Sequence, residues 1–143
     1  MNVAAILKAK GHNVVTVRPD TTLEEVVRRL AQKRIGAIVV MGASGRIDGI
    51  ISERDVIRVI AERGAACLEE PVARSMTRTV QTCDVADTLD ELMAIMTAGR
   101  FRHLPVVEDD ALAGIVSIGD VVKHHIAEVE MEASALKGYI VAG

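Results

Sequence analysis

The chain has 143 residues, of which 50% are hydrophobic and 26% are charged, a composition typical of a globular protein with a sizeable core. Its net charge of -3 and its single phenylalanine and tyrosine argue against a nucleic-acid partner, which requires concentrated positive charge or stacking aromatic rings. The sequence has no apolar run long enough to cross a membrane and no signal-peptide pattern at its start, so we expect a cytoplasmic protein without a membrane partner.

The chain contains two copies of one pattern. When Leu23 is aligned with Leu89, many surrounding residues match as far as a turn, where the second copy is one residue shorter. Loops accept such length changes more easily than packed elements do. The matched pairs are Val14 and Val80, Thr16 and Thr82, Thr22 and Thr88, Glu25 and Glu91, Gly49 and Gly114, Ser52 and Ser117, and Asp55 and Asp120.

Each copy predicts the order β-α-β-β-α. The elements predicted in the first copy are strands at 14–17, 37–41 and 46–51 and helices at 23–34 and 53–62. Those predicted in the second copy are strands near Val80, at 104–107 and at 112–116, and helices that begin after Thr88 and around Asp120. We interpret Thr22 and Thr88 as helix caps.

The pattern indicates a mixed α/β (α+β) protein built from two repeats with helical flanks. The predicted parts are an N-terminal helical lead at 1–13, the first repeat at 14–63, a connector at 64–79, the second repeat at 80–127 and a helical tail at 128–143.

The first helices of the two repeats differ at one informative position. Four residues form an apolar arc of about 100°, which is enough to cover a sheet: Leu23, Val26, Val27 and Leu30. In the second repeat Ile95 replaces Arg29 and widens the arc. A wide apolar face is typical either of extra core or of an interface, and the replacement of arginine by isoleucine favours a homodimer contact.

The two cysteines do not indicate a metal site. Cys83 takes the place of Val17 in the repeat, which predicts a small core residue, and no cysteine or histidine spacing matches a zinc site. Cys67 is predicted to be exposed, which leaves a redox role as an alternative. We expect no bound metal.

One strand-to-helix junction occurs twice, at Gly49–Asp55 and at Gly114–Asp120. In each, a glycine precedes an apolar run, and Ser-x-x-Asp follows where a helix should begin. A helix N-terminus offers unpaired N–H groups and a partial positive charge, which suits a phosphate. The same spacing also predicts a capping box, in which the serine and aspartate satisfy each other's backbone donors. Both interpretations can hold together, because a capping serine can still face a ligand.

Taken together, these segments resemble a pair of cystathionine-β-synthase (CBS) domains, the tandem called a Bateman module. The resemblance covers almost the whole chain, including the flanks at Ile6–Gly11 and Gly138–Ile140, and it is similar to the stand-alone members of the family. The segments that carry it are Val14–Pro19, Ile35–Val40, Gly49–Val56, Arg102–Val107 and Gly114–Val121. The resemblance implies that two repeats pack about a pseudo-two-fold axis and leave two clefts for adenosine-containing ligands.

The resemblance also implies roles for matching residues. Asp55 and Asp120 would hold ribose hydroxyls, and Ser52 and Ser117 would reach ribose or phosphate. Thr16 and Thr82 would border the base.

The two clefts are not predicted to be equivalent. Arg54 in the first repeat corresponds to Gly119 in the second, so only one helix start carries a cation. Arg102 and His103 align with Gly36 and Ala37, so these polar groups come from the second repeat alone, although His103 can equally be a solvated histidine at a strand edge. Four cations are candidates for a phosphate partner and otherwise are surface charges: Lys10, Arg34, Arg100 and Lys123.

These observations favour a regulatory module that senses an adenosine nucleotide and signals to a separate, unidentified protein. AMP is the preferred ligand, while ATP, NAD(H) and S-adenosylmethionine remain open. We predict no catalytic residues, because the sequence shows no nucleophile with an adjacent base in a recognisable motif. The alternative is a structural dimerisation module with vestigial clefts, which the importance of Asp55 and Asp120 for binding would distinguish.

Overall fold

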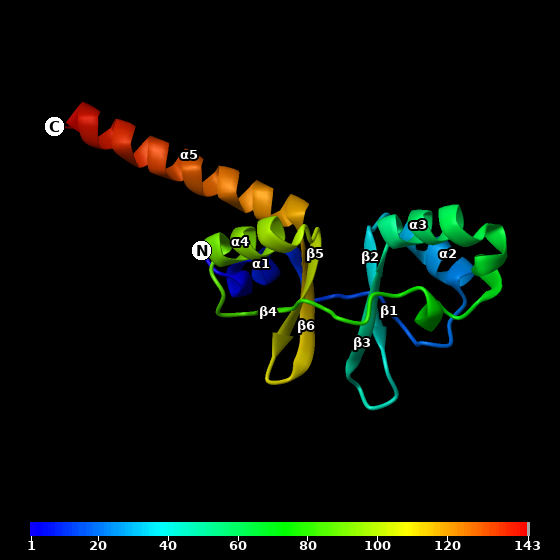
Figure 1. Cartoon of the computed structure of the whole chain (residues 1–143). Helices are drawn as coiled ribbons and strands as arrows, with labels where there is room; N and C mark the ends of the chain where they lie inside the picture. The colour runs from blue at the N-terminus through cyan, green and yellow to red at the C-terminus, as the bar shows by residue number, and fades with distance from the viewer. Residues whose placement is uncertain (143) are drawn as a thin grey trace.

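The computed structural model describes residues 1–142 and places two small sheets side by side at the centre, with helices on the outside (Figure 1). The first repeat contains β1 (Thr16–Val17), α2 (Leu23–Lys33), β2 (Ala37–Met41), β3 (Ile47–Ser52) and α3 (Glu53–Arg63). The second contains β4 (Cys83–Asp84), α4 (Leu89–Gly99), β5 (His103–Glu108), β6 (Ala111–Ser117) and α5 (Ile118–Ala142). The predicted α/β class and repeat order are confirmed.

The two sheets have the same topology and almost the same register. In each, the first strand is parallel to the middle strand, and the middle strand is antiparallel to the third. Ser52, the last residue of β3, lies opposite Ala37, and Ser117, the last residue of β6, lies opposite His103. The register therefore brings each serine beside the start of its own middle strand.

Equivalent residues begin and end the first helices. The hydroxyl Oγ1 of Thr22 accepts a hydrogen bond from Glu25 N at 3.2 Å, and that of Thr88 accepts one from Glu91 N at 3.1 Å, so the predicted caps are confirmed. Arg34 and Arg100 follow the two helices with φ values of 53° and 57°. This left-handed conformation ends α2 one residue earlier than the sequence predicted.

The strand predicted near Val80 begins three residues later, at Cys83. Thr77 forms a bridge with Ile50 of β3, with N···O distances of 3.0 and 2.9 Å. The chain then reaches the second sheet only at Cys83, where β4 begins. The connector therefore runs first along the edge of one repeat and then into the other.

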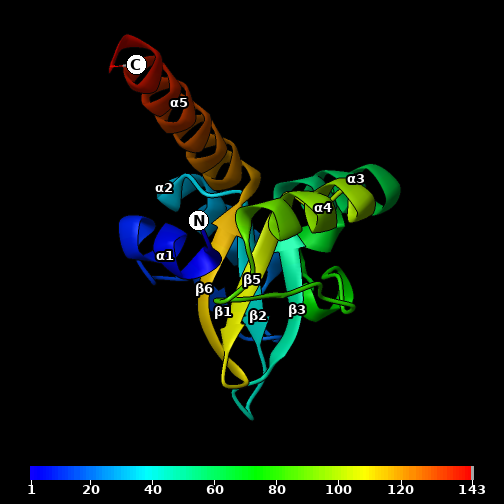
Figure 2. The same cartoon turned by 90° about the vertical axis from the view of Figure 1, so that its left-hand side faces the viewer.

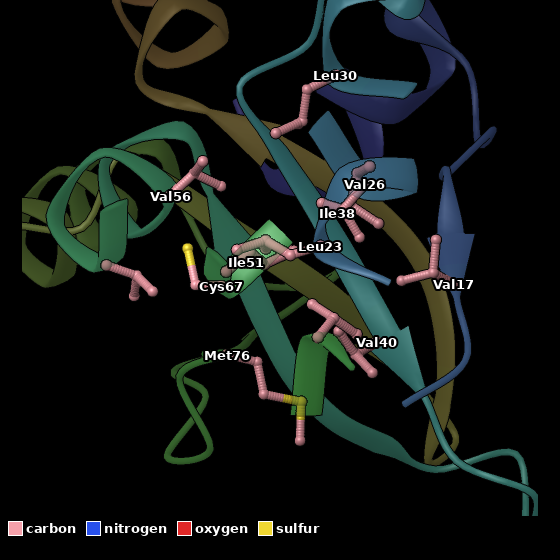
Figure 3. Close-up of a cluster of buried hydrophobic side chains, with 12 residues drawn as sticks. Val17, Leu23, Val26, Leu30, Ile38, Val40, Ile51, Val56, Cys67 and Met76 are labelled. Atoms are coloured by element: carbon pink, nitrogen blue, oxygen red, sulfur yellow. The ribbon is translucent and has the colours of Figure 1, made fainter. Parts of the chain in front are cut away.

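The core of the first repeat is completed by the connector. Its buried side chains include Leu23, Ile38 and Ile51 together with Cys67, Val72 and Met76, which follow α3 (Figure 3). Cys67 lies in a 3₁₀ turn, η1 (Ala65–Glu69), that packs against α2 and α3. Only 1% of Cys67 is exposed. The predicted exposure of this thiol is therefore wrong, and the redox alternative loses its basis.

The core of the second repeat is completed by the N-terminus. The helix α1 (Val3–Lys10) buries Val3, Ile6 and Leu7 against the second repeat, not the first. Cys83 is buried in this core, as predicted. Ile95 is half-buried against it, whereas its counterpart Arg29 bonds Glu25 and the Thr16 carbonyl. The wider apolar arc of α4 thus covers core within the chain, and the homodimer stays a prediction.

The last helix, α5, has 25 residues and projects away from both repeats (Figures 1 and 2). It crosses the predicted boundary at residues 127 and 128 without a break. Gly143, the last residue of the predicted tail, lies outside the described residues. In the part of the chain that the structure describes, no helix combines the length and hydropathy needed to cross a bilayer.

Candidate functional site

Two clefts lie where the repeats meet, and each is lined by residues of both. Cleft 1 has a volume of about 270 Å³ beside the junction of β3 and α3. Cleft 2 has a volume of about 280 Å³ beside the junction of β6 and α5. The opposite repeat contributes equivalent loops to the two clefts, residues 99–103 to cleft 1 and residues 34–37 to cleft 2.

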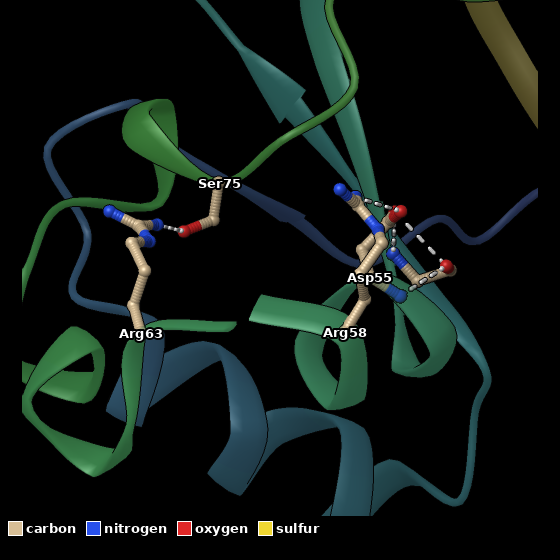
Figure 4. A network of polar contacts seen from close by, with 5 residues as sticks. Asp55, Arg58, Arg63 and Ser75 are labelled. Atoms are coloured by element: carbon tan, nitrogen blue, oxygen red, sulfur yellow. Dashed lines mark hydrogen bonds and ion pairs between the residues drawn. The ribbon is translucent and has the colours of Figure 1, made fainter. Parts of the chain in front are cut away.

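The strand-to-helix junction at cleft 1 is a closed capping box. Ser52 Oγ accepts a hydrogen bond from Asp55 N at 3.2 Å, and Asp55 Oδ2 accepts one from Ser52 N at 3.0 Å. Arg58 contacts the second oxygen, Asp55 Oδ1, at 3.1 Å (Figure 4). The capping interpretation is therefore confirmed, and a ligand at Asp55 would have to compete with Arg58.

The junction at cleft 2 has the same two capping bonds and a different cation. Asp120 Oδ2 accepts from Ser117 N at 2.9 Å, and Ser117 Oγ accepts from Asp120 N at 3.2 Å. The Lys10 ammonium donates to Asp120 Oδ2 at 2.6 Å and to the Ile115 carbonyl at 2.9 Å. Among the described residues, no hydrogen-bond donor reaches Asp120 Oδ1.

The pKa of Asp120 is set by opposing effects. Partial burial raises it, but the hydrogen bonds from Lys10 and Ser117 and the charge of Lys10 outweigh burial and hold the pKa below its ordinary value of 3.8. Asp120 is therefore ionised at neutral pH, and its ion pair with Lys10 joins the start of α5 to the end of α1.

His103 and Gly36 form a wall that both clefts share. A Cβ atom on Gly36 would lie 2.9 Å from two ring atoms of His103, so the imidazole approaches the backbone at a distance that only glycine permits. The pKa of His103 lies below 6.5. Burial is the largest cause and the charge of Lys10 the second, and together they outweigh the opposing charge of Glu53. At neutral pH the shared wall is uncharged.

Among the described residues, cleft 1 has more cations without ion-pair partners than cleft 2 has. Arg54, Arg100 and Arg102 line it, and none of the three forms an ion pair with another described residue. Two carboxylates oppose this charge: Glu53, and Asp55, which is paired with Arg58. Cleft 2 is lined by Lys10 and Arg34, and Lys10 is already engaged by Asp120. Guanidinium groups without partners suit a phosphate, so cleft 1 is better equipped for a highly charged ligand.

Most of the predicted site residues lie at one cleft or the other. Cleft 1 is lined by Ser52, Arg54, Asp55, Arg100, Arg102 and His103, and cleft 2 by Lys10, Arg34, His103 and Ser117. Asp120 does not itself line either cleft, but it bonds Lys10 and Ser117, which line cleft 2. In the described chain, Thr16, Thr82 and Lys123 line neither cleft. Successive residues of an extended segment point to opposite sides, so Gln81 rather than its neighbour Thr82 faces cleft 1.

Sequence reasoning missed polar residues in the segments that approach the sheets. Thr77, Thr79 and Gln81 line cleft 1, and Asn13 lines cleft 2. The alignment of the repeats places Asn13 on Thr79, which is a signal that could have identified this pair. Phe101 also lines cleft 1. One of the chain's two aromatic side chains is therefore available at this cleft.

No group of histidine, cysteine, aspartate or glutamate residues suited to a metal ion occurs within residues 1–142. The polar groups that face the clefts are hydroxyl, amide, carboxylate, guanidinium and imidazole groups. They can bind an anion and orient a diol.

The fold defines a scaffold of two repeats with a cleft on each side of their junction. The chain belongs to the CBS domain family, whose model matches residues 8–62 and 72–126. It is 33% identical to the mitochondrial CBS domain-containing protein CBSX3 of Arabidopsis thaliana, over 99% of this chain and 72% of that protein.

Solved structures of CBS proteins have the same fold. The CBS-domain containing protein ATU1752 from Agrobacterium tumefaciens is 49% identical, with a TM-score of 0.83 over 85% of this chain and 91% of that chain. The CBS domain protein PAE2072 from Pyrobaculum aerophilum, solved in complex with AMP, is 26% identical, with a TM-score of 0.75 over 84% of this chain and 89% of that chain.

Proposed function

We propose that this protein is a regulatory module that binds an adenosine-containing ligand between its CBS repeats and signals to a separate protein. The observation that carries the proposal is the occurrence of two inter-repeat clefts, each beside a Ser-x-x-Asp helix start and each lined by cations. The complex of the relative PAE2072 with AMP supports this ligand class.

Cleft 1 is the proposed main site for a nucleotide that carries phosphate. Arg54, Arg100 and Arg102 supply three cations for the phosphate, and Phe101 supplies an aromatic face for the base. Asp55 is the proposed acceptor for ribose hydroxyls, after displacement of Arg58. AMP is the preferred ligand because the cleft offers cations for one phosphate, and NAD(H) or ATP remain the alternatives.

Cleft 2 is the proposed site for a ligand with less charge. Asp120 Oδ1 would accept hydrogen bonds from a ribose diol, while Lys10 keeps Asp120 in place. Asp120→Ala and a 2′-deoxy ligand should each weaken binding by about 1 to 3 kcal/mol, and the two losses should not add. Full additivity would show that the carboxylate contacts another part of the ligand.

The first experiment is thermal unfolding of nucleotide-free protein with AMP, ADP, ATP, NAD, NADH and S-adenosylmethionine. A ligand at about 100 times its dissociation constant stabilises the folded state by roughly 2.7 kcal/mol, which is a midpoint shift on the order of 5 to 10 °C at this size. A shift with one ligand supports the sensor and identifies its signal. The absence of any shift would favour the alternative, a structural dimerisation module with vestigial clefts.

Regulation requires that the ligand prefer one arrangement of the repeats or of a homodimer. The coupling to the regulated protein cannot exceed the difference in ligand affinity between the two arrangements. Small-angle scattering with and without the stabilising ligand measures this difference in arrangement. An identical profile at ligand saturation would contradict a mechanism based on rearrangement of the repeats.

A further inference from the structure

The outer part of α5 carries an apolar stripe that nothing in the described chain covers. Every described residue from Val129 to Val141 is exposed. Val122, Ile126, Val129, Leu136 and Ile140 each leave half or more of their surface to solvent. Leaving such an apolar surface in water is unfavourable.

The stripe has the spacing of a coiled coil. Its members follow one another at alternating intervals of four and three residues, and at about 100° per residue they occupy an arc of roughly 80°. We call this set the α5 seam: Val122, Ile126, Val129, Ala133, Leu136 and Ile140.

The α5 seam faces away from the rest of the molecule. Residues on the other side of the helix hold α5 to the body: Asp120 pairs with Lys10 at 2.6 Å, Val121 is buried in the second core, and Glu128 pairs with the N-terminal amine at 3.0 Å. At about 100° per residue, these three lie roughly 100° to 160° around the helix from the middle of the seam. The seam is therefore free to meet another molecule without disturbing these contacts.

We propose that the α5 seam pairs in parallel with the same seam of a second copy to form a two-stranded coiled coil. In heptad terms, Ile126, Ala133 and Ile140 occupy the a positions, and Val129 and Leu136 occupy the d positions. Ile126 and Ile140 at a and Leu136 at d follow the pattern of a β-branched residue at a with leucine at d, which favours two parallel strands, whereas Ala133 and Val129 do not contribute to it. A two-fold axis along the helices brings identical surfaces together, as a homodimer requires.

Charges beside the seam select the parallel orientation. Glu132 occupies a g position and Lys137 the following e position. In the parallel pair, Glu132 of each copy faces Lys137 of the other, which forms two attractive pairs. In the antiparallel pair with full overlap, g positions face each other, and Glu132 lies opposite Glu132 of the second copy. Self-association with attraction on both sides therefore requires parallel helices.

Cysteine cross-linking tests both the contact and its direction. The native Cys67 and Cys83 are buried, so the unmodified protein should form no disulfide with diamide. Leu136→Cys places two thiols at the same level of a parallel pair. Met131→Cys is the matched control, because Met131 is 72% exposed and lies on the opposite side of α5. We expect Leu136→Cys to form the covalent dimer at least ten times faster than Met131→Cys.

Equal rates for the two cysteine variants would overturn the proposal. In an antiparallel pair, Leu136 lies opposite Ile126 of the second copy, about 15 Å along the helix from the other Leu136. If the Ile126→Cys and Leu136→Cys proteins cross-link to each other in a mixture but neither cross-links to itself, the helices are antiparallel and the proposal is overturned.

Charge-reversal variants test the Glu132–Lys137 pairs, and analytical ultracentrifugation measures the dissociation constant of the dimer. Glu132→Lys should weaken the dimer about five-fold, as expected for two exposed ion pairs, and the double variant Glu132→Lys with Lys137→Glu should restore the original dissociation constant. Val129→Lys should abolish the contact, whereas Met131→Lys should not. Unchanged association in Val129→Lys would place the interface elsewhere and overturn the proposal. These measurements need no nucleotide, so they are independent of the proposed function.

Discussion

The two repeats share one backbone plan but are completed by different parts of the chain. The first core includes Cys67, Val72 and Met76 of the connector, and the second includes Val3, Ile6 and Leu7 of α1. In both, a side chain from the segment that precedes the other repeat packs against the strand glycine: Met76 against Gly49 and Leu7 against Gly114. The N-terminal segment is therefore a structural part of the distant second repeat.

The clefts differ more than the cores do. The junction at cleft 1 faces three arginines without ion-pair partners among the described residues, while the junction at cleft 2 holds Lys10 against Asp120. Identical capping boxes thus stand in different electrostatic surroundings. The start of the helix is therefore the same in both repeats, whereas residues that differ between the repeats set what each cleft can bind.

The largest expected effect tests the role of α1 in the second core. Leu7→Ala removes a fully buried side chain next to Gly114 and should lower the free energy of unfolding by about 2 to 5 kcal/mol. Met76→Ala should cost a similar amount in the first core. Urea unfolding measures both, with exposed Ile57→Ala as the control. A loss no larger than that of the control would show that α1 does not belong to this core.

The next effect tests the charge difference between the clefts. Arg102→Gln should weaken binding of AMP by about 1.5 to 3 kcal/mol, as expected for a hydrogen bond to a charged group, and should leave adenosine binding unchanged. Calorimetry measures both ligands. Arg46→Gln is the control, because Arg46 is exposed in the β2–β3 turn. An equal loss for AMP and adenosine would contradict a phosphate contact.

A smaller effect tests the ion pair of cleft 2. Lys10→Met should destabilise the protein by on the order of 1 kcal/mol at pH 7, since the pair is partly exposed. Because the folded-state pKa of Asp120 is lowered, its contribution is present above 3.8 and is lost as pH falls through the lower folded value. The difference between wild type and Lys10→Met should therefore shrink in acid. A difference in unfolding free energy that does not change with pH would indicate a packing role for Lys10.

The smallest effect concerns the wall between the clefts. The pKa of His103 is lowered by burial, so the unfolded state binds more protons, and stability rises with pH up to about the ordinary value of 6.5. His103→Gln should remove this pH dependence. The change in the free energy of unfolding over this pH range is no more than about 1 kcal/mol, because the ring is partly solvated. Titration of the imidazole by NMR measures the pKa directly. A value at or above 6.5 in the ligand-free protein would contradict the described burial.

The sequence by itself determined the repeat and much of each cleft. Glycine, an apolar run and Ser-x-x-Asp predict a strand that ends in a capped helix, because strand propensity and capping are local properties. The alignment of the two copies also predicted that Arg54 and Arg102 would have no counterpart in the other repeat. Local patterns therefore identified the junctions and the inequality between the clefts.

Only the tertiary structure decided which distant residues complete each site and each core. The contact of Lys10 with Asp120, the shared wall of His103 and Gly36, the aromatic ring of Phe101 at cleft 1 and the burial of Cys67 all depend on how separate segments pack. Sequence periodicity reports which face of an element is apolar but not which segment will cover it. The placement of α1 on the second repeat therefore had to come from the packed structure.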